Sequence, residues 1–165
     1  MRNYENLLRE NLFENKKLRF IEAHSGISAK IASTISIKNK KYGGIWVSSL
    51  TTSALKGFPD IELDCLIDRF RVIDNIRSSS NLDVIVDFDT GGSVKNFQYA
   101  CRKLEKFGVS GVVIEDKCGD KINSLVNGAK HVLEDEHKFA EKIQKAKSCC
   151  QKDGLLIFAR LESLI

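Results

Sequence analysis

Short apolar runs alternate with longer amphipathic segments along this chain. The runs are mostly apolar and rich in β-branched residues, and they fall at 19–23, 44–49, 83–89, 111–115 and 155–161. Strands of this kind are buried on both faces, which is typical of a parallel sheet covered by helices. The pattern therefore predicts an α/β protein with parallel strands separated by helices.

The segment 61–79 has the clearest helical pattern, and Asp60 stands where the N-cap of this helix would lie. Its apolar stripe consists of Ile61, Cys65, Ile67, Phe70, Val72, Ile73 and Ile76. Gly108 ends a second predicted helix, and Gly154 lies beyond the end of another. These further helices are expected at 3–17, 94–108 and 134–154.

Length and composition limit the classes of protein that fit. The chain has 165 residues and 42% hydrophobic content, enough for one domain with a real core. Its 26 basic and 22 acidic residues are spread along the chain, and the basic run 38–41 is short, so no nucleic-acid partner is expected. No apolar stretch approaches the ~18 residues that a membrane span needs.

The cysteines indicate the compartment. Their number is odd, their spacing shows no CxxC pair, and they stand at Cys65, Cys101, Cys118, Cys149 and Cys150. The first 17 residues lack the apolar stretch of a secretory signal. The sequence therefore predicts reduced thiols and a cytoplasmic location.

Polar residues follow several predicted strands on their carboxyl side. Asp87 and Asp89 end the run at 83–89, Glu115 ends the next one, and Arg160 lies near the end of the last. In parallel α/β folds, ligand sites form at the carboxyl ends of the strands. We therefore expect these side chains to converge on one site.

The two aspartates are candidate metal ligands. In an extended strand, residues two apart share a face, so Asp87 and Asp89 would point the same way. Two unpaired carboxylates at this distance repel each other, and a hard divalent cation such as Mg²⁺ relieves the repulsion. The alternative is a solvated strand end that caps the next helix.

Five sequence blocks together indicate a family. They are FIEAHSGISAKIA, GIWVSSLTTSALKGFPD, DVIVDFDTGG, GVVIEDKCGDKINS and IFARLESLI, in this order along the chain. In order and spacing they resemble the phosphoenolpyruvate mutase branch of the isocitrate lyase superfamily, over about residues 18–165. The chain then divides into an amino-terminal helix at 1–17 and a β/α barrel region at 18–165.

The resemblance implies an eight-stranded (β/α) barrel, of which this chain carries about five units. It also implies an isomerase that interconverts phosphoenolpyruvate and phosphonopyruvate in phosphonate biosynthesis. Five strands cannot close a barrel. We therefore expect a fragment, a subunit completed by another chain or by missing carboxyl-terminal units, a homo-oligomer, or a degenerate protein without catalysis.

The resemblance also assigns residues to a Mg²⁺ and pyruvate site. Asp87 would ligate Mg²⁺, Asp89 and Glu115 would hold waters on the metal, and Asp60 would face both metal and substrate. The loop after the second strand would bind pyruvate through a serine hydroxyl and backbone amides. The residues of this part of the site are Trp46, Ser48, Ser49 and Leu50, where Ser49 replaces the glycine usual in the family.

Three further residues match the phosphoryl end of the family site. Lys121 and Asn123 lie in a polar segment that matches a mobile gating loop, and Arg160 matches an arginine that clamps the phosphoryl group. Phosphoryl transfer needs mainly positioning and positive charge, which these residue types supply. Taken without the surrounding blocks, Lys121 and Asn123 are ordinary loop residues.

Related activities remain as alternatives. Cys118 followed by glycine resembles the catalytic cysteine motif of the lyases, but it stands five residues too early. Asn123 favours the mutase over the related phosphonopyruvate hydrolase. His24 is interpreted as structural. A Mg²⁺ and oxoacid binding module without catalysis is the remaining alternative.

Overall fold

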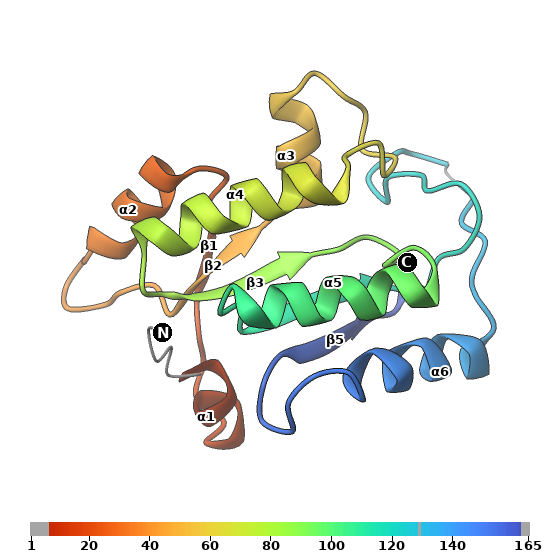
Figure 1. Ribbon diagram of the computed structural model, residues 1–165. Helices are drawn as coiled ribbons and strands as arrows, with labels where there is room; N and C mark the ends of the chain where they lie inside the picture. Colours follow the sequence, from red (N-terminus) through yellow and green to blue (C-terminus); the bar gives the residue numbers. More distant parts are fainter. Residues whose placement is uncertain (1–6, 129, 163–165) are drawn as a thin grey trace.

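The computed structural model describes residues 7–128 and 130–162, in which five parallel strands form one sheet (Figure 1). The strands pair in chain order from β1 to β5. Their bounds are Phe20–Glu22 for β1, Gly44–Val47 for β2, Asp83–Asp87 for β3, Gly111–Glu115 for β4 and Leu156–Arg160 for β5. The predicted parallel α/β fold is therefore confirmed.

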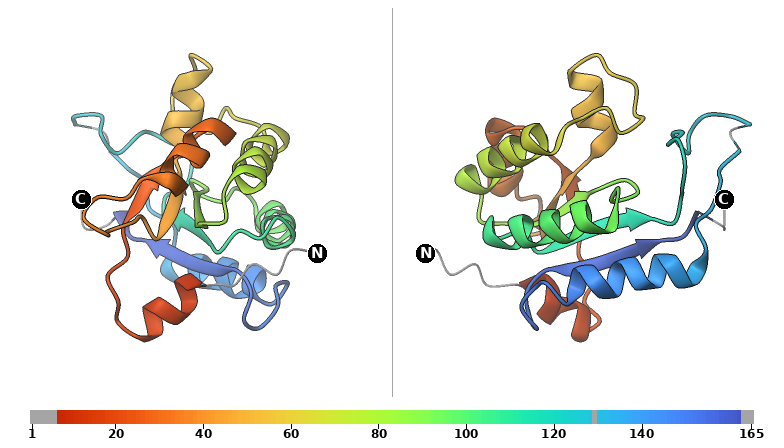
Figure 2. Two further views of the ribbon diagram at one scale, coloured as in Figure 1. Left: turned by 90° about the vertical axis from the view of Figure 1, so that its left-hand side faces the viewer. Right: turned by 45° about the vertical axis from the view of Figure 1, so that its right-hand side comes forward.

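Helices connect the strands and cover one face of the sheet. In the described residues these helices are α2 (Gly26–Thr34), α3 (Ser49–Leu55), α4 (Leu66–Ser79), α5 (Val94–Lys106) and α6 (Glu136–Lys147), preceded by α1 (Leu7–Phe13). Helices α2, α4, α5 and α6 form a layer along the outer face, and α2 packs on α4 and α5 on α6 (Figures 1 and 2). Helix α3 projects from the end of β2.

Alternation along the strands divides the core into two clusters. Ile45 and Val47 of β2 turn toward the helices and join the larger cluster, whereas Trp46 between them turns to the other face. Ile85 of β3 and Val113 of β4 share that second face. Strands apolar on both faces are expected in a parallel sheet that is covered on both sides.

Helix α1 covers part of the second, concave face of the sheet. Its Leu8 is only 2% exposed and packs with Ile85 and Val113. Gly44 makes room on this face, because a Cβ there would come within 2.1 Å of the ring of Phe20. Helix α1 therefore buries apolar side chains that the open sheet would otherwise expose.

The sheet has two open edges within the described residues. Strand β1 pairs only with β2, and β5 pairs only with β4. The sheet is therefore an open arc of five strands, as predicted.

The helix predicted at 61–79 is shorter than expected. The helix expected at 61–79 begins at Leu66, with Cys65 as its N-cap, so the N-cap prediction for Asp60 is wrong. Glu62 has a φ of 60°, in the left-handed region, which is incompatible with a helix at this point. Ile67 is 64% exposed and does not belong to the buried stripe.

Other boundaries were also misplaced or missed. The helix expected at 3–17 spans Leu7–Phe13, and residues 1–6 lie outside the described part. The helix at 94–108 ends at Lys106, with Gly108 at a φ of 72° beyond it as predicted. The helix at 134–154 spans Glu136–Lys147. Helices α2 and α3 were not predicted as elements; each begins at a serine N-cap, a signal that the sequence does contain.

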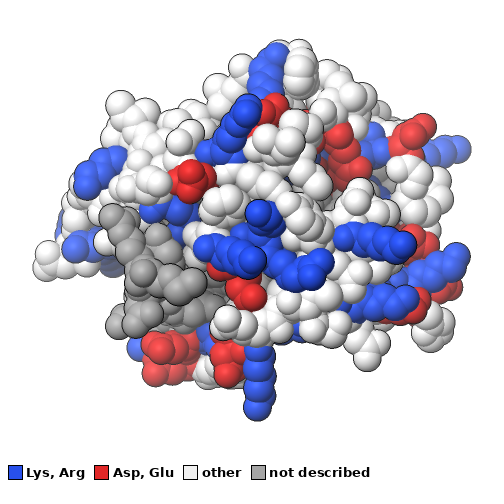
Figure 3. Space-filling view, in the orientation of Figure 1, with Lys and Arg blue, Asp and Glu red and all other residues white. Residues whose placement is uncertain are grey.

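The outer faces of α5 and α6 are polar. Basic and acidic side chains are interspersed over this side of the molecule (Figure 3). On α6, Lys145 pairs with Glu141 one turn earlier, at 2.5 Å. Such pairs stabilise a solvated helix face by about 0.2–0.5 kcal/mol.

The packing of α1 generates a stability prediction. Replacing Leu8 by alanine should lower the free energy of unfolding by about 2–5 kcal/mol, because it leaves a cavity against the concave face. Leu12→Ala on the same helix is the control, since Leu12 is 45% exposed. Urea unfolding measures both variants, and equal effects would show that α1 does not cover the sheet.

Candidate functional site

The carboxyl ends of the strands surround a cavity of about 270 Å³, called here the rim cavity. It is lined by the predicted site residues Trp46, Ser48, Ser49, Leu50, Asp60, Asp87, Glu115, Lys121, Asn123 and Arg160, together with Ser124 and Leu125. Of the predicted set, only Asp89 is not among its lining residues. Parallel strands bring these residues together because their carboxyl ends meet at one edge.

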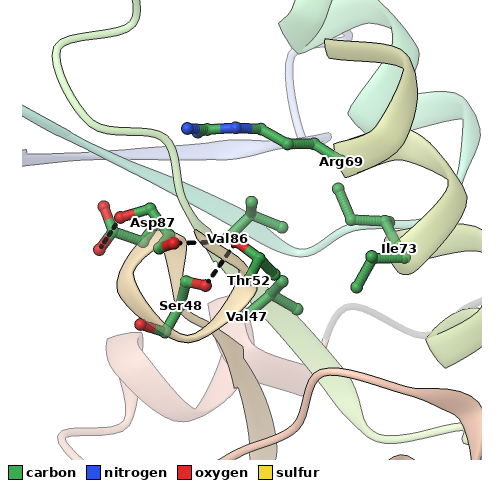
Figure 4. A pocket seen from close by; sticks show the side chains of 9 residues that line it. Val47, Ser48, Thr52, Arg69, Ile73, Val86 and Asp87 are labelled. Carbon is green, nitrogen blue, oxygen red and sulfur yellow. Dashed lines mark hydrogen bonds between the residues drawn. The ribbon is translucent and has the colours of Figure 1, made fainter. Parts of the chain in front are cut away.

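Asp87 ends β3 beside the first turn of α3 (Figure 4). The Ser49 hydroxyl donates to Asp87 Oδ2 at 3.3 Å, and the Asp89 amide donates to Oδ1 at 3.3 Å. Behind the carboxylate, Ile73 and Val86 line a small apolar pocket. Burial in this setting, followed by the nearby charge of Asp89, raises the pKa of Asp87.

Asp89 lies beyond the strand in a different environment. Strand β3 ends at Asp87, and Asp89 has a φ of 54°, so the predicted same-face strand pair is wrong. Its carboxylate pairs with Arg69 of α4 through one oxygen and with Lys121 through the other. Burial alone would raise the pKa of Asp89, but the charges of Arg69 and Lys121 outweigh it and lower the pKa.

Glu115 presents an incompletely satisfied carboxylate at the end of β4. Its Oε1 is buried without a hydrogen-bond partner among the described residues, and Lys117 Nζ lies 3.6 Å away. Burial raises the pKa of Glu115, although Lys117 and Lys121 oppose this effect. Together with Asp87, it provides carboxylate oxygens on one wall of the rim cavity.

Asp60 is held by two residues of the loop after β4. Lys121 Nζ and Asn123 Nδ2 each donate to one of its carboxylate oxygens at 2.7 Å. Lys121 is buried, which would lower its pKa, but Asp89 and Asp60 outweigh this and raise the pKa above its usual value. The protonated ammonium group therefore joins the two aspartates at the mouth of the site.

Arg160 lies at the end of β5 with its guanidinium group at the cavity. Its Nε lies 2.6 Å from Glu162 Oε1, and its Nη2 donates to Ser124 Oγ at 3.3 Å. Its Nη1 lies 3.9 Å from Glu115. The arginine is thus oriented by neighbours that sequence reasoning did not assign.

A second set of contacts supports the turn after β3. Glu62 accepts hydrogen bonds from the Thr90 amide at 2.8 Å and from the Thr90 hydroxyl at 2.7 Å. Lys142 of α6 is buried and donates to the Thr90 carbonyl oxygen at 3.0 Å. Burial lowers the pKa of Lys142. These contacts fix the turn that places Asp89.

Signals for some of the missed residues are present in the sequence. Arg69 lies four residues before Ile73, on the stripe that α4 buries, and a charged residue at such a position needs a partner. Lys117 lies two residues after Glu115, within the block GVVIEDKCGDKINS. No local pattern points to Glu62 or Lys142, because their partner lies far away in the chain.

The remaining predicted residues have simpler surroundings. Ser48 caps α3 by accepting a hydrogen bond from the Thr51 amide at 3.3 Å. His24 Nδ1 lies 3.3 Å from Glu22, consistent with a structural role. Cys118 is not among the residues that line the rim cavity. The five cysteines form no disulfide with one another in the described residues.

Comparison with known proteins agrees with this arrangement. A family profile described as phosphoenolpyruvate phosphomutase matches residues 8–165. The chain belongs to this family. It is 32% identical over 158 residues to a phosphoenolpyruvate phosphomutase of Tetrahymena pyriformis, covering 94% of this chain and 51% of that protein. It is 30% identical to a phosphonopyruvate hydrolase of Variovorax sp., covering 96% of this chain and 53% of the hydrolase.

Solved structures of family members have the same fold. The phosphoenolpyruvate phosphomutase of Streptomyces platensis superposes with a TM-score of 0.84 at 29% identity, over 96% of this chain and 54% of that one. A phosphonopyruvate hydrolase complex with oxalate and Mg²⁺ gives a TM-score of 0.82 at 27% identity, over 96% and 53%. The chain therefore spans about half the length of its relatives and carries five of the eight units of a (β/α) barrel.

The pairing of Asp89 generates a stability prediction. Arg69→Met removes one of its two cations and should lower the free energy of unfolding, toward the lower end of ~3–5 kcal/mol because Lys121 remains. Arg71→Met is the control on the same helix, since Arg71 is 75% exposed and pairs with the surface residue Asp68. Its loss should stay below ~1 kcal/mol in the same denaturant titration. Similar losses in the two variants would contradict the role of Arg69.

Proposed function

We propose that this chain carries the metal and substrate-binding part of a phosphoenolpyruvate mutase-like isomerase, which interconverts phosphoenolpyruvate and phosphonopyruvate in phosphonate biosynthesis. The observation that carries the proposal is the rim cavity, where carboxylates of Asp87 and Glu115 share one space with Lys121, Asn123 and Arg160. Such a cavity suits a metal ion and a phosphorylated oxoacid together. The activity is assigned to the completed barrel, because the relatives are about twice as long.

The residues at the ends of β3 and β4 fit Mg²⁺. Glu115 Oε1 is buried without a hydrogen-bond partner among the described residues, and burial raises the pKa of Asp87. Both features show that the nearby cations do not fully compensate these buried carboxylates. The atoms available to bind a metal are carboxylate oxygens, which are the hard ligands that Mg²⁺ prefers. We assign Asp87 as ligand and Glu115 to a water-mediated contact. Both oxygens of Asp89 are paired with Arg69 and Lys121, so Asp89 would support the metal site through its amide hydrogen bond to Asp87, and not through the water-mediated contact expected from the resemblance. When bound, Mg²⁺ would neutralise charge on the enolate oxygen of pyruvate.

The turn from β2 into α3 would bind the pyruvate part of the substrate. Ser48, Ser49 and Leu50 lie at this turn, and Trp46 forms the adjoining wall of the rim cavity. The first amide groups of a helix have no intrahelical partner, so they can donate to a carboxylate. This turn would hold the oxoacid while leaving its methylene carbon toward Asp60.

The phosphoryl group would lie between Lys121, Asn123 and Arg160. Lys121 and Asn123 now donate to both oxygens of Asp60, and an anionic phosphoryl group can replace that carboxylate as their partner. In the reaction, the bond from phosphorus to the enol oxygen breaks and a bond from phosphorus to the methylene carbon forms. The three side chains would stabilise the migrating group, while Asp60 orients the reacting carbon.

Other activities of the superfamily are the competing candidates. The similarity to a phosphonopyruvate hydrolase keeps hydrolysis as the second candidate, in which the bond from phosphorus to the methylene carbon breaks and water, in place of the enolate oxygen, accepts the phosphoryl group. A lyase mechanism based on Cys118 is disfavoured, because Cys118 is not among the lining residues of the rim cavity. A binding module without catalysis would retain the metal site alone.

The location and the partners of the protein are proposed from its membership of the family. We propose a cytoplasmic enzyme that takes a small-molecule substrate and acts as a homo-oligomer or with completing β/α units. No helix in the described part of the chain is both long and apolar enough to cross a membrane.

The metal assignment predicts calorimetric behaviour. The chain should bind Mg²⁺, Asp87→Asn should lose this binding, and Asp74→Asn should retain it because Asp74 is exposed on α4. Affinity should fall on acidification, beginning above the usual carboxylate pKa of about 4, because burial raises the pKa of Asp87 and Glu115 and protons then compete with the metal. Unchanged affinity in Asp87→Asn would refute the assignment.

The reaction is tested with phosphonopyruvate and the protein together with the units that complete its barrel. Phosphorus NMR should show a phosphate ester, and Asn123→Ala should lower kcat by about 10²-fold through lost transition-state contacts, with less effect on Mg²⁺ affinity. Inorganic phosphate as the product would assign the protein to the hydrolases instead.

A further inference from the structure

A group of three residues, two of them buried, lies next to the rim cavity and connects two segments far apart in the sequence. We call it the buried strap; it consists of Lys117, Ser124 and Glu162. Lys117 Nζ donates to Ser124 Oγ at 2.7 Å and lies 3.2 Å from Glu162 Oε2, and Ser124 Oγ donates to the same carboxylate oxygen at 2.7 Å. The side chains of Lys117 and Glu162 are 3% and 0% exposed.

We propose that Glu162 is a positioning residue, whose carboxylate holds Arg160 in its orientation and fixes the loop 117–124 over the site at the same time. Glu162 and Lys117 are not among the residues that line the rim cavity, so neither is expected to touch a ligand there. The effect on catalysis rests on the proposed function, whereas the effect on the loop and on the arginine does not.

The arginine contact is a close ion pair. Glu162 Oε1 lies 2.6 Å from Arg160 Nε, which leaves the terminal nitrogens Nη1 and Nη2 turned toward Glu115 and Ser124. The Arg160 side chain is 40% exposed and long, so its other orientations would be open without this contact. An arginine held by an ion pair at Nε keeps its two terminal nitrogens available to a phosphoryl group.

The loop contact fixes both ends of the segment that carries Lys121 and Asn123. Lys117 lies at the start of the loop, where it also donates to the Ile122 carbonyl oxygen at 3.2 Å, and Ser124 lies at its end. The Glu162 amide donates to Asp116 Oδ1 at 2.8 Å, which joins the end of β5 to the residue before the loop. One carboxylate therefore connects the loop and the arginine.

The charge of Glu162 is required for this role. Burial would raise the pKa of Glu162, but the hydrogen bond from Ser124 and the ammonium group of Lys117 outweigh burial and lower the pKa. The carboxylate is ionised at neutral pH, accepts a hydrogen bond from Ser124 and forms ion pairs with Lys117 and Arg160. A neutral amide at this position would keep the volume of the side chain but would turn an NH₂ group toward one of its cations.

Glu162→Gln tests the proposal, with Glu136→Gln as control because Glu136 is 88% exposed on α6. Hydrogen exchange should become at least about tenfold faster for amides of 117–126, while β2 to β4 keep their protection. The Nε–H signal of Arg160, assigned by its loss in Arg160→Lys, should move toward the position of a solvated arginine. Ser124→Ala is a milder second variant and should loosen the same segment without affecting the sheet.

A double-mutant cycle separates the strap from general stability. If Lys117 and Glu162 act as one unit, Lys117→Met combined with Glu162→Gln should loosen the loop less than the sum of the single changes. In the completed enzyme, Glu162→Gln should lower kcat roughly 10- to 100-fold with a smaller change in KM, because Arg160 is misplaced in the transition state.

The proposal is overturned by any of three results. If hydrogen exchange rises equally across the whole sheet, Glu162 only stabilises the fold. If exchange in the loop does not change, Glu162 does not hold the loop. An unchanged Arg160 signal would remove the positioning role. A different outcome would contradict the proposed reaction and leave the buried strap supported: the completed enzyme without substitutions is inactive, while Glu162→Gln still loosens the loop and shifts the Arg160 signal.

Discussion

The buried carboxylate of Asp89 is the interaction on which the site depends. It forms ion pairs with Arg69 of α4 and with Lys121 of the loop after β4. It therefore connects the helix layer, the end of β3 and the loop over the cavity. Lys121 in turn reaches Asp60 in the segment before α4. A buried charge without partners is costly, so each of these segments is held where its side chain satisfies the others.

The carboxylates at the rim divide into two kinds by their partners. Asp89 and Glu162 have cations and hydrogen bonds that outweigh burial and lower their pKa. Asp87 and Glu115 are less well compensated, and burial raises their pKa. The first kind fixes the structure, while the second lacks positive charge that an added cation can supply. This division explains why a metal site and a rigid ionic network lie side by side.

The open sheet explains the placement of α1. Five strands form an arc with a concave apolar face, and Leu8 of α1 packs into part of it. Larger side chains of that face, among them Trp46 and Phe158, are only partly buried. In the relatives, which are about twice as long, further chain is available to surround such a face. The rim cavity is nevertheless formed within the described residues, because its lining comes from the ends of β2 to β5, from Asp60 and from the loop after β4.

The sequence by itself determined the five parallel strands and the strand-end residues Asp87, Glu115 and Arg160, because apolar runs and the polar residues that end them are local patterns. The other residues of the rim, among them Lys121 and Asn123, were predicted only through the family resemblance. The sequence pattern misplaced Asp60 as a helix cap and Asp89 as a strand residue, since both conformations depend on partners far away in the chain. Arg69 and Glu162 were not predicted for the same reason. Ion pairs between distant segments leave no periodic signal, so only the tertiary structure decided which carboxylates are paired and which stay available.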